Sequence, residues 1–355
     1  RATQGGSKLL TVPTAAARTG NLSAYGVPIF NPATGLQYAG NIIPACTAGQ
    51  TAAANGCLST QALAVLNLMP APTNANLVDN FVAAGSETFN NDVFNVRIDG
   101  RLSDNFNLFG RYSQAKFTLT GPTAFGQGGG PELVSLGGSS NTQNRSLAIG
   151  FDYSVTPTTI IDVRFGFFNY KVNVLPFDFG TSPATTAGIP GLNNDEFSSG
   201  LFAGFVGINT ATASRDFNFG SGLGVNRCNC PLDQDEKQYQ VVTNLTKIWG
   251  DHTFKFGTDI RRAFNLRVPS DNHRSGELSF ARTRTAQIVG GLPVAGTGSG
   301  LATFLVGDVT GFRRYVSTST DARESQWRHF YYAQDTWRAT PKLTLALGLR
   351  ADIFN

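Results

Sequence analysis

Residues 147–155 read Leu-Ala-Ile-Gly-Phe-Asp-Tyr-Ser-Val, and this stretch decides the fold class. Every second residue is large and apolar, while the residues between them are small or charged. Side chains alternate between the two faces of a β-strand, so this period of two predicts a strand with one apolar face. Residues 156–158 (Thr-Pro-Thr) interrupt the pattern, because proline fixes φ and has no N–H donor. The alternation resumes over residues 161–167, so we expect a β-hairpin over residues 143–174.

Three further stretches follow the same pattern. We expect hairpins at residues 92–117, 237–262 and 328–354, with tight turns at 103–105, 156–158, 249–252 and 339–342. A strand in a soluble protein usually has about five or six residues, whereas these runs approach the roughly 9–11 residues that cross a bilayer at a tilt. Long strands with short turns on one side and long loops on the other are typical of outer-membrane barrels. We therefore predict an all-β fold, an antiparallel up-and-down transmembrane β-barrel segment of about eight long strands with long extracellular loops.

The long loops divide the chain. Residues 1–91 show little regular pattern and are expected to form a long extracellular loop region before the visible strands, while residues 92–355 form the partial β-barrel. Within the loops, helical spacing predicts one short helix from Thr60 to Leu68. The apolar run at residues 301–307 is expected to form either a buried helix or a short strand.

Composition excludes some functional classes. The formal net charge is +4, and the basic residues are scattered, so no nucleic-acid-binding patch is indicated. No apolar run approaches the roughly 18 residues of a membrane helix, and the mean hydropathy is −0.11. A barrel places its apolar residues at alternate positions, so a low mean hydropathy is compatible with it.

The four cysteines, Cys46, Cys57, Cys228 and Cys230, all lie in polar, loop-like sequence. Neither pair has zinc-site spacing with histidines nearby, so we expect disulfides formed in an oxidising compartment. Cys46 with Cys57 is the natural local pair. Cross-pairing among the four is also possible, and the sequence leaves all three connectivities open.

Charged residues in the predicted strands fall on the face opposite the apolar one. A charge on the lipid face near the midplane costs about 2–4 kcal/mol for Arg or Lys, so this face should border a wet lumen, either as a conduit for a ligand or as a wall of ion pairs. The predicted lumen-facing residues are Arg97, Asp99, Arg111, Asp152, Asp162, Arg164, Lys255, Asp259, Arg261 and Arg350. Aromatic residues that would anchor strand ends at the membrane interface are Tyr153, Trp249, Tyr331, Tyr332 and Trp337.

Several stretches resemble the barrel of Oar-like TonB-dependent receptors. They are residues 94–99 (Phe-Asn-Val-Arg-Ile-Asp), 108–113 (Leu-Phe-Gly-Arg-Tyr-Ser), 252–257 (His-Thr-Phe-Lys-Phe-Gly), 276–280 (Gly-Glu-Leu-Ser-Phe), 331–337 (Tyr-Tyr-Ala-Gln-Asp-Thr-Trp) and 343–350 (Leu-Thr-Leu-Ala-Leu-Gly-Leu-Arg). Loop segments at residues 31–35, 40–44 and 70–72 fit the same family. The resemblance covers nearly the whole chain in the right order, although Ala351 stands where an aromatic residue is usual.

The resemblance implies an outer-membrane barrel of about 22 strands with an N-terminal plug, energised from the inner membrane through TonB. Such receptors import large or scarce ligands, such as iron chelates, cobalamin or glycans. Because the plug and a TonB box are missing and the chain stops after a strand, we expect a fragment from the first half of a barrel. Its partners would be outer-membrane lipid, the TonB complex acting through the missing plug, and an unknown extracellular ligand.

The leading hypothesis is therefore a fragment of an outer-membrane receptor that binds its ligand at the loops of residues 1–91, 175–236 and 263–327. We expect no catalytic residues, no cofactor and no metal site, because no nucleophile–base set, carboxylate pair or metal-ligand cluster stands out. One alternative is a secreted or surface β-rich adhesion or structural protein, which would need both faces of its strands covered. Another is a passive porin-like channel.

Overall fold

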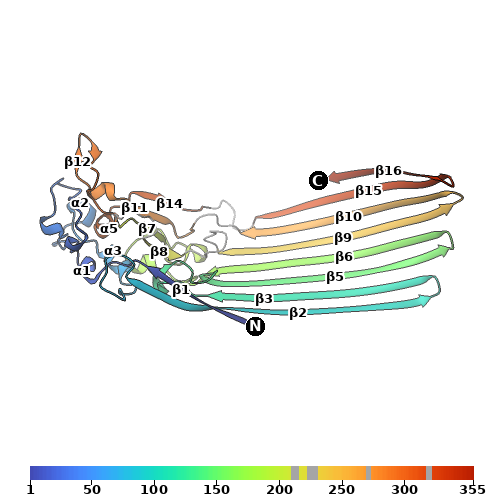
Figure 1. Ribbon diagram of the computed structural model, residues 1–355, viewed down its shortest axis with the longest axis horizontal. Coiled ribbons are helices and arrows are strands. Elements are labelled where there is room, and N and C mark those ends of the chain that lie inside the picture. The colour runs from blue at the N-terminus through green and yellow to red at the C-terminus, as the bar shows by residue number, and fades with distance from the viewer. Residues whose placement is uncertain (209–215, 222–230, 269–272, 317–321) are drawn as a thin grey trace.

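The computed structural model describes residues 1–208, 216–221, 231–268, 273–316 and 322–355. Long strands run side by side over most of its length, and a domain of loops and short elements lies at one end (Figure 1). Nine strands form one sheet in the order β1-β2-β3-β5-β6-β9-β10-β15-β16, and every neighbouring pair is antiparallel. The predicted fold class is confirmed.

The strands of the large sheet are long, from 9 residues in β1 to 23 in β2. They are β1 (Ala2–Leu10), β2 (Phe81–Ser103), β3 (Phe106–Gly121), β5 (Gly138–Thr156), β6 (Thr159–Pro176), β9 (Leu232–Trp249), β10 (His252–Val268), β15 (Arg323–Thr340) and β16 (Leu343–Phe354). Tight turns join β2 to β3, β5 to β6, β9 to β10 and β15 to β16 at the end away from the loop domain (Figure 1).

The sheet extends beyond the predicted hairpins. β2 begins at Phe81 rather than at residue 92, and β1 adds a ninth strand from within residues 1–91. The added part of β2 pairs with β1, from Ala2 opposite Phe89 to Leu10 opposite Phe81. These residues include Gly5, Gly6 and Gly85 and have no regular apolar alternation. For this reason the sequence pattern does not reveal them as strands.

The remaining connections fold together into the loop domain. Its helices are α1 (Ala15–Arg18), α2 (Ala52–Asn55), α3 (Thr60–Leu66), α4 (Pro183–Thr186) and α5 (Gly300–Leu305), with short 3₁₀ segments at Ser23–Tyr25, Ala39–Asn41, Gly126–Gly128, Glu196–Ser198 and Arg282–Thr285. Its strands are β4 (Gly129–Gly130), β7 (Ala203–Val206), β8 (Phe217–Ser221), β11 (Glu277–Phe280), β12 (Ile288–Val289), β13 (Leu292–Pro293) and β14 (Gly311–Arg313). Five of them form a second sheet in the order β14-β11-β7-β8-β4.

Both predicted loop features are present. The short helix expected within residues 60–68 is α3, whose N-terminus is capped by Ser59, the Oγ of which accepts a hydrogen bond from the Ala62 N–H at 3.2 Å. The apolar run at residues 301–307 forms α5, the helix of the two alternatives, and all six residues of α5 are buried.

The main hydrophobic core lies in the loop domain. Its centre is a cluster of phenylalanines that come from separate connections of the chain, with ring centroids 5.1 to 6.4 Å apart. These residues are Phe202, Phe217, Phe219, Phe280 and Phe304, and each is no more than 4% exposed. The loops therefore form one folded domain with its own core.

The large sheet is held differently, since many of its large apolar side chains are exposed. In β16 these are Leu343, Leu347, Leu349, Ile353 and Phe354, which are 47 to 78% exposed. Within the described residues, no helix is long and apolar enough to cross a membrane. Among the described residues, β2 from Asn90 to Ser103 has no partner on its β1 side, and β16 pairs only with β15.

The apolar face of β16 generates a prediction that uses two neighbouring residues. Leu349, opposite Ala333, lies on the apolar face, and Gly348, opposite Gln334, lies on the polar face with room for a side chain. We expect Leu349→Arg to lower the free energy of unfolding from lipid by about 2–4 kcal/mol, because the guanidinium would meet hydrocarbon. Gly348→Arg should cost much less. Denaturant titration of the full-length protein in vesicles measures both, and equal losses would contradict the assignment of the faces.

Candidate ligand-binding and transport surfaces

All ten predicted charged residues lie on one face of the large sheet, which we call the polar face. Residues opposite each other on neighbouring strands share a face. Arg97 is opposite Arg111, Asp152 is opposite Asp162, and Arg261 is opposite Gln240. The same ladders bring in Asp99, Arg164, Lys255, Asp259 and Arg350.

Most charges on the polar face are paired, largely with a neighbour two positions away on the same strand. Arg97 binds Asp99 at 2.7 Å, and Arg261 binds Asp259 at 2.6 Å. The remaining pairs are Arg350 with Asp352 at 2.7 Å and Arg164 with Asp162 at 2.6 Å and with Asp152 on the next strand at 3.6 Å. Among the described residues, Arg111 and Lys255 form no ion pair. The polar face is thus mostly a wall of ion pairs, and of the ten predicted residues only Arg111 and Lys255 stand outside these pairs in the described part of the chain.

Glycines allow aromatic rings to lie across the strands of this face. Gly150 is opposite Phe109, and a Cβ at Gly150 would lie only 2.7 Å from the Phe109 ring. The ring therefore lies over β5, where the guanidinium carbons of Arg97 and Arg164 approach its centroid at 4.9 and 5.5 Å. This cation–π arrangement connects β2, β3 and β6.

A second glycine organises a hydrogen-bonded network. Gly257 is opposite Tyr332, and a Cβ at Gly257 would overlap the tyrosine ring. The Tyr332 hydroxyl donates to Asn244 Oδ1 at 2.9 Å, and Asn244 Nδ2 donates to Asp162 Oδ1 at 2.9 Å. The network therefore runs from β15 across β10 and β9 to β6.

This placement corrects part of the predicted aromatic set. Tyr331 and Tyr332 lie in the middle of β15 rather than near its end, and Tyr332 lies on the polar face. Adjacent residues of a strand face opposite sides, so only one of the two tyrosines can share the apolar face. Tyr153, Trp249 and Trp337 lie near the tight turns.

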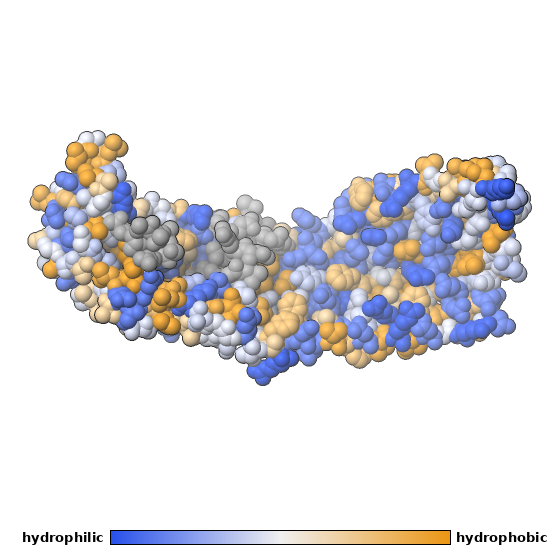
Figure 2. All heavy atoms as spheres, in the orientation of Figure 1, coloured by the Kyte–Doolittle hydropathy of each residue, from blue (hydrophilic) through white to orange (hydrophobic). Residues whose placement is uncertain are grey.

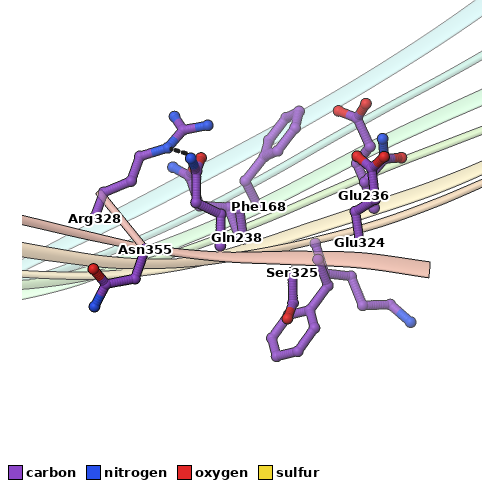
Figure 3. Close-up of a pocket in the computed structure, with 12 residues that line it drawn as sticks. Phe168, Glu236, Gln238, Glu324, Ser325, Arg328 and Asn355 are labelled. Carbon is purple, nitrogen blue, oxygen red and sulfur yellow. Dashed lines mark hydrogen bonds between the residues drawn. The ribbon is translucent and has the colours of Figure 1, made fainter.

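The polar face ends in a hollow of about 690 Å³ toward the loop domain (Figure 3). Asn265 is opposite both Glu236 and Glu324, so these residues lie side by side across three strands. Arg328 also lines the hollow and donates from Nε to Gln326 Oε1 at 2.6 Å. In Figure 3, Ser325 points to the opposite side from Arg328. Among the described residues, no group of three or more His, Cys, Asp or Glu side chains could hold a metal ion.

The loop domain is fastened to the sheet by a buried carboxylate. Glu87 in β2 is 7% exposed, and its Oε2 accepts hydrogen bonds from the N–H and hydroxyl of Ser135 and from the Leu136 N–H at 2.6 to 3.1 Å. Within the loop domain, Cys46 and Cys57 form a disulfide. Cys228 and Cys230 lie outside the described residues.

Two buried titratable side chains of the loop domain were not identified from the sequence. Burial lowers the pKa of His273 to about 4, with Glu277 acting in the opposite direction. Burial also raises the pKa of Asp178 to about 6, although the Leu201 N–H donates to its Oδ2 at 2.6 Å. His273 lies in a polar stretch of sequence and Asp178 lies between two phenylalanines, and neither belongs to a recognisable motif. Only the tertiary packing reveals that both are buried.

Comparison with known proteins supplies the family. The family model described as an outer membrane beta barrel domain matches residues 1–355. The chain belongs to the outer membrane beta barrel domain family. Its location is therefore the cell outer membrane.

Solved structures with a similar arrangement include three proteins, each longer than this chain. The outer membrane transporter YddB from Escherichia coli is 12% identical with a TM-score of 0.41, and the match covers 78% of this chain and 29% of YddB. BauA, the ferric preacinetobactin receptor from Acinetobacter baumannii, is 12% identical with a TM-score of 0.39, and the match covers 77% of this chain and 36% of BauA. The ferric-catecholate import receptor Fiu from E. coli K12 is 13% identical with a TM-score of 0.40, and the match covers 77% of this chain and 36% of Fiu. The chain thus spans about a third of their length. Among curated proteins, none matches the sequence.

In an outer-membrane barrel the apolar face meets lipid, and aromatic belts mark its edges. Near the tight turns, His252 stacks on Trp337 at 5.3 Å and bonds to Asp335 at 2.7 Å. Toward the loop domain, Arg262 lies 4.9 Å from the ring centroids of both Phe264 and Trp327. His252 and Arg262 are ten residues apart on β10, which at about 3.3 Å per residue and a tilt of about 40° gives about 25 Å. This height agrees with the usual apolar band of an outer-membrane barrel.

The glycine beneath Tyr332 can be tested with a matched control in the same barrel wall. We expect Gly257→Ala to lower the free energy of unfolding of the full-length barrel by about 1–3 kcal/mol, because the new methyl group displaces the Tyr332 ring from Asn244. Gly166→Ala on the same face should be nearly neutral, since its Cβ would lie 3.7 Å from the nearest atom, in Gln240. Denaturant titration compares the two, and equal stabilities would contradict the argument.

His273 predicts that the loop domain loses stability in acid. Folded His273 stays neutral down to about pH 4, whereas the unfolded side chain takes up a proton below its ordinary pKa of 6.5. The unfolded state thus binds more protons, and stability should fall by up to about 3 kcal/mol as pH falls from 6.5 to 4. Hydrogen exchange of β11, corrected for the intrinsic pH dependence, measures this change in the full-length protein.

His273→Asn provides the control for this titration. It should flatten the pH dependence between pH 6.5 and pH 4. Asp178 acts in the opposite direction, because its raised pKa of about 6 gives stability that is present below 3.8 and is lost as pH rises through 6. The unsubstituted protein and the His273→Asn variant both retain Asp178, so the difference between their pH dependences of stability comes from His273. The same pH slope in both would show that His273 is not the source.

Proposed function

We propose that this chain is the part of a TonB-dependent outer-membrane receptor of the Oar-like kind that binds a ligand at its loop domain and contributes to a barrel wall through which the ligand is imported. The observation that carries the proposal is the loop domain itself. It has a hydrophobic core and a five-stranded sheet of its own, at the end of the strands opposite the tight turns. A folded domain offers fixed surfaces for recognition, which separate loops would not provide.

Two further features support this function. The barrel motifs at residues 94–113 and 331–350 resemble Oar-like receptors in sequence and occupy β2, β3, β15 and β16. The polar face offers Arg111 and Lys255, which are not engaged in ion pairs among the described residues, as contacts for a plug or a passing solute. In this proposal the plug and the remaining strands lie outside the 355 residues, and no residue of the chain has a catalytic role.

The alternatives are separated by their physical requirements. An adhesion protein would have to cover both faces of its sheet, yet Leu347 and Leu349 remain 57 and 78% exposed. The apolar face therefore favours a lipid environment over a water-soluble surface protein. A passive porin-like channel has the same apolar face, so it must be distinguished by its transport behaviour.

Energised import predicts two results for the full-length protein. The immobilised C-terminal periplasmic domain of TonB should retain the protein from detergent extract, while a passive porin used as the control should pass through. In planar lipid bilayers the protein should show no steady conductance, because a plug closes the barrel. A protein that conducts steadily and is not retained by TonB would be a passive channel. Extraction into buffer without detergent would instead support the adhesion protein.

A further inference from the structure

Three basic residues lie side by side on the large sheet, near the ends of the strands that lead into the loop domain. They are Lys116 in β3, Arg145 in β5 and Lys171 in β6, and all three are exposed. We call them the basic cluster. Hydrophilic and hydrophobic residues both appear over the strands (Figure 2), so the pairing of the strands is needed to show which residues share a face.

The pairing places the basic cluster on the apolar face. Lys116 and Lys171 both lie opposite Gln143, and Arg145 lies two positions further along β5. Opposite residues share a face, and so do residues two positions apart on one strand. Arg145 therefore faces the same side as Leu147, which begins the apolar series of β5. The basic cluster borders this series on the side of the loop domain.

The three side chains are close enough to contact one ligand. Neighbouring strands lie about 4.8 Å apart, so the Cα atoms of Lys116 and Lys171 are about 10 Å apart across β5. Arg145 is diagonal to both, with Cα separations of about 7–8 Å, which long side chains can span. Like charges at such distances repel each other, so a bound anion would stabilise this arrangement.

The basic cluster is not neutralised within the described part of the chain. None of its three residues forms an ion pair or a side-chain hydrogen bond there. Two carboxylates lie beside it on the same face, Asp92 opposite Lys116 and Asp235 opposite Lys171. Asp235 is bound to Lys237 at 3.3 Å, and no ion pair joins Asp92 to Lys116. Three positive charges thus adjoin a single carboxylate that is not already paired.

The height of the basic cluster fits the headgroup region of a bilayer. Lys171 lies ten residues from Ile161, the apolar residue of this face nearest to the tight turn in β6. At about 3.3 Å per residue and a tilt of about 40°, this corresponds to about 25 Å. The apolar band of an outer-membrane barrel has about this height, so the basic cluster lies where hydrocarbon gives way to lipid headgroups.

We propose that the basic cluster binds the headgroup of a membrane lipid that carries two phosphate groups, while the acyl chains lie against the apolar face. Arg forms paired hydrogen bonds with a phosphate, and Lys supplies a point charge. The three positive charges are balanced more closely by two phosphates than by one. The ligand is a lipid rather than a soluble phosphate, because Leu147 and Phe167 continue the same face with an apolar surface. This inference goes beyond the proposed import function and rests on the location in the outer membrane.

The experiment titrates the full-length protein in dodecyl maltoside with two lipids that differ by one phosphate, bisphosphorylated hexa-acyl lipid A and its monophosphorylated form. Native mass spectrometry measures the two dissociation constants. The bisphosphorylated lipid should bind at least about fivefold more tightly, the size expected for one basic residue beside an anionic headgroup. Inorganic pyrophosphate at the same concentration has two phosphates but no acyl chains, so it should not displace the lipid.

Variants assign the binding to the basic cluster. Arg145→Gln and Lys171→Gln should each weaken the bisphosphorylated lipid about fivefold. Arg145→Lys keeps the charge and should weaken it less. Lys247→Gln is the matched control, because Lys247 lies on the same face near the tight turn of β9, where it donates to Thr159 Oγ1 at 2.9 Å. This control should leave the affinity unchanged.

The outcomes separate this inference from the proposed function. Equal affinity for the two lipids, or displacement by pyrophosphate, would overturn the lipid site, and both tests use the unsubstituted protein and so do not depend on the folding of a variant. Equal losses in Lys247→Gln and Arg145→Gln would also overturn it, since any interfacial cation would then serve. Absence of lipid selectivity while TonB still retains the protein would overturn only the lipid site. Selective lipid binding without TonB retention would overturn the import function and leave the lipid site.

Discussion

The register of the backbone hydrogen bonds across the large sheet is the constraint on which the rest of this structure depends. Hydrocarbon offers no water to an unpaired N–H or C=O group, so strands that cross a membrane must pair along their whole length. That pairing also decides which side chains face lipid. A slip of one residue in β5 would move Asp152 to the apolar face and Phe151 to the polar face, so the membrane strongly favours the observed register.

The details of the polar face follow from the same register. Phe109 can lie across β5 because its ladder neighbour is Gly150, and Tyr332 can reach Asn244 because Gly257 lies between them. A side chain at either glycine would overlap the aromatic ring that now lies over it. The same rule applies to the edges of β2 and β16 that are unpaired among the described residues, because an unpaired strand edge is unfavourable within lipid.

The loop domain is stabilised by another principle, the burial of apolar surface away from water. Its buried carboxylates differ in the number of hydrogen bonds that they accept. Glu87 is buried but receives three hydrogen bonds, which suits a structural link between β2 and the segment at residues 135–136. Asp178 is also buried, but only one of its oxygens accepts a hydrogen bond among the described residues, from the Leu201 N–H.

The sequence by itself determined the membrane strands, their tight turns and their two faces, because alternation along a strand is a local pattern. It also located α3 through local helical spacing and marked residues 301–307 as an apolar element, while leaving open whether that element is a helix or a strand. It did not reveal β1 or the part of β2 that pairs with it, from Phe81 to Phe89, because neither face has a regular apolar series there. Only the tertiary structure decided that residues 203–206, 217–221 and 277–280 share one sheet, since these contacts join distant segments. It likewise decided that Tyr332, rather than Tyr331, enters the polar face, because the strand register places Gly257 beneath its ring.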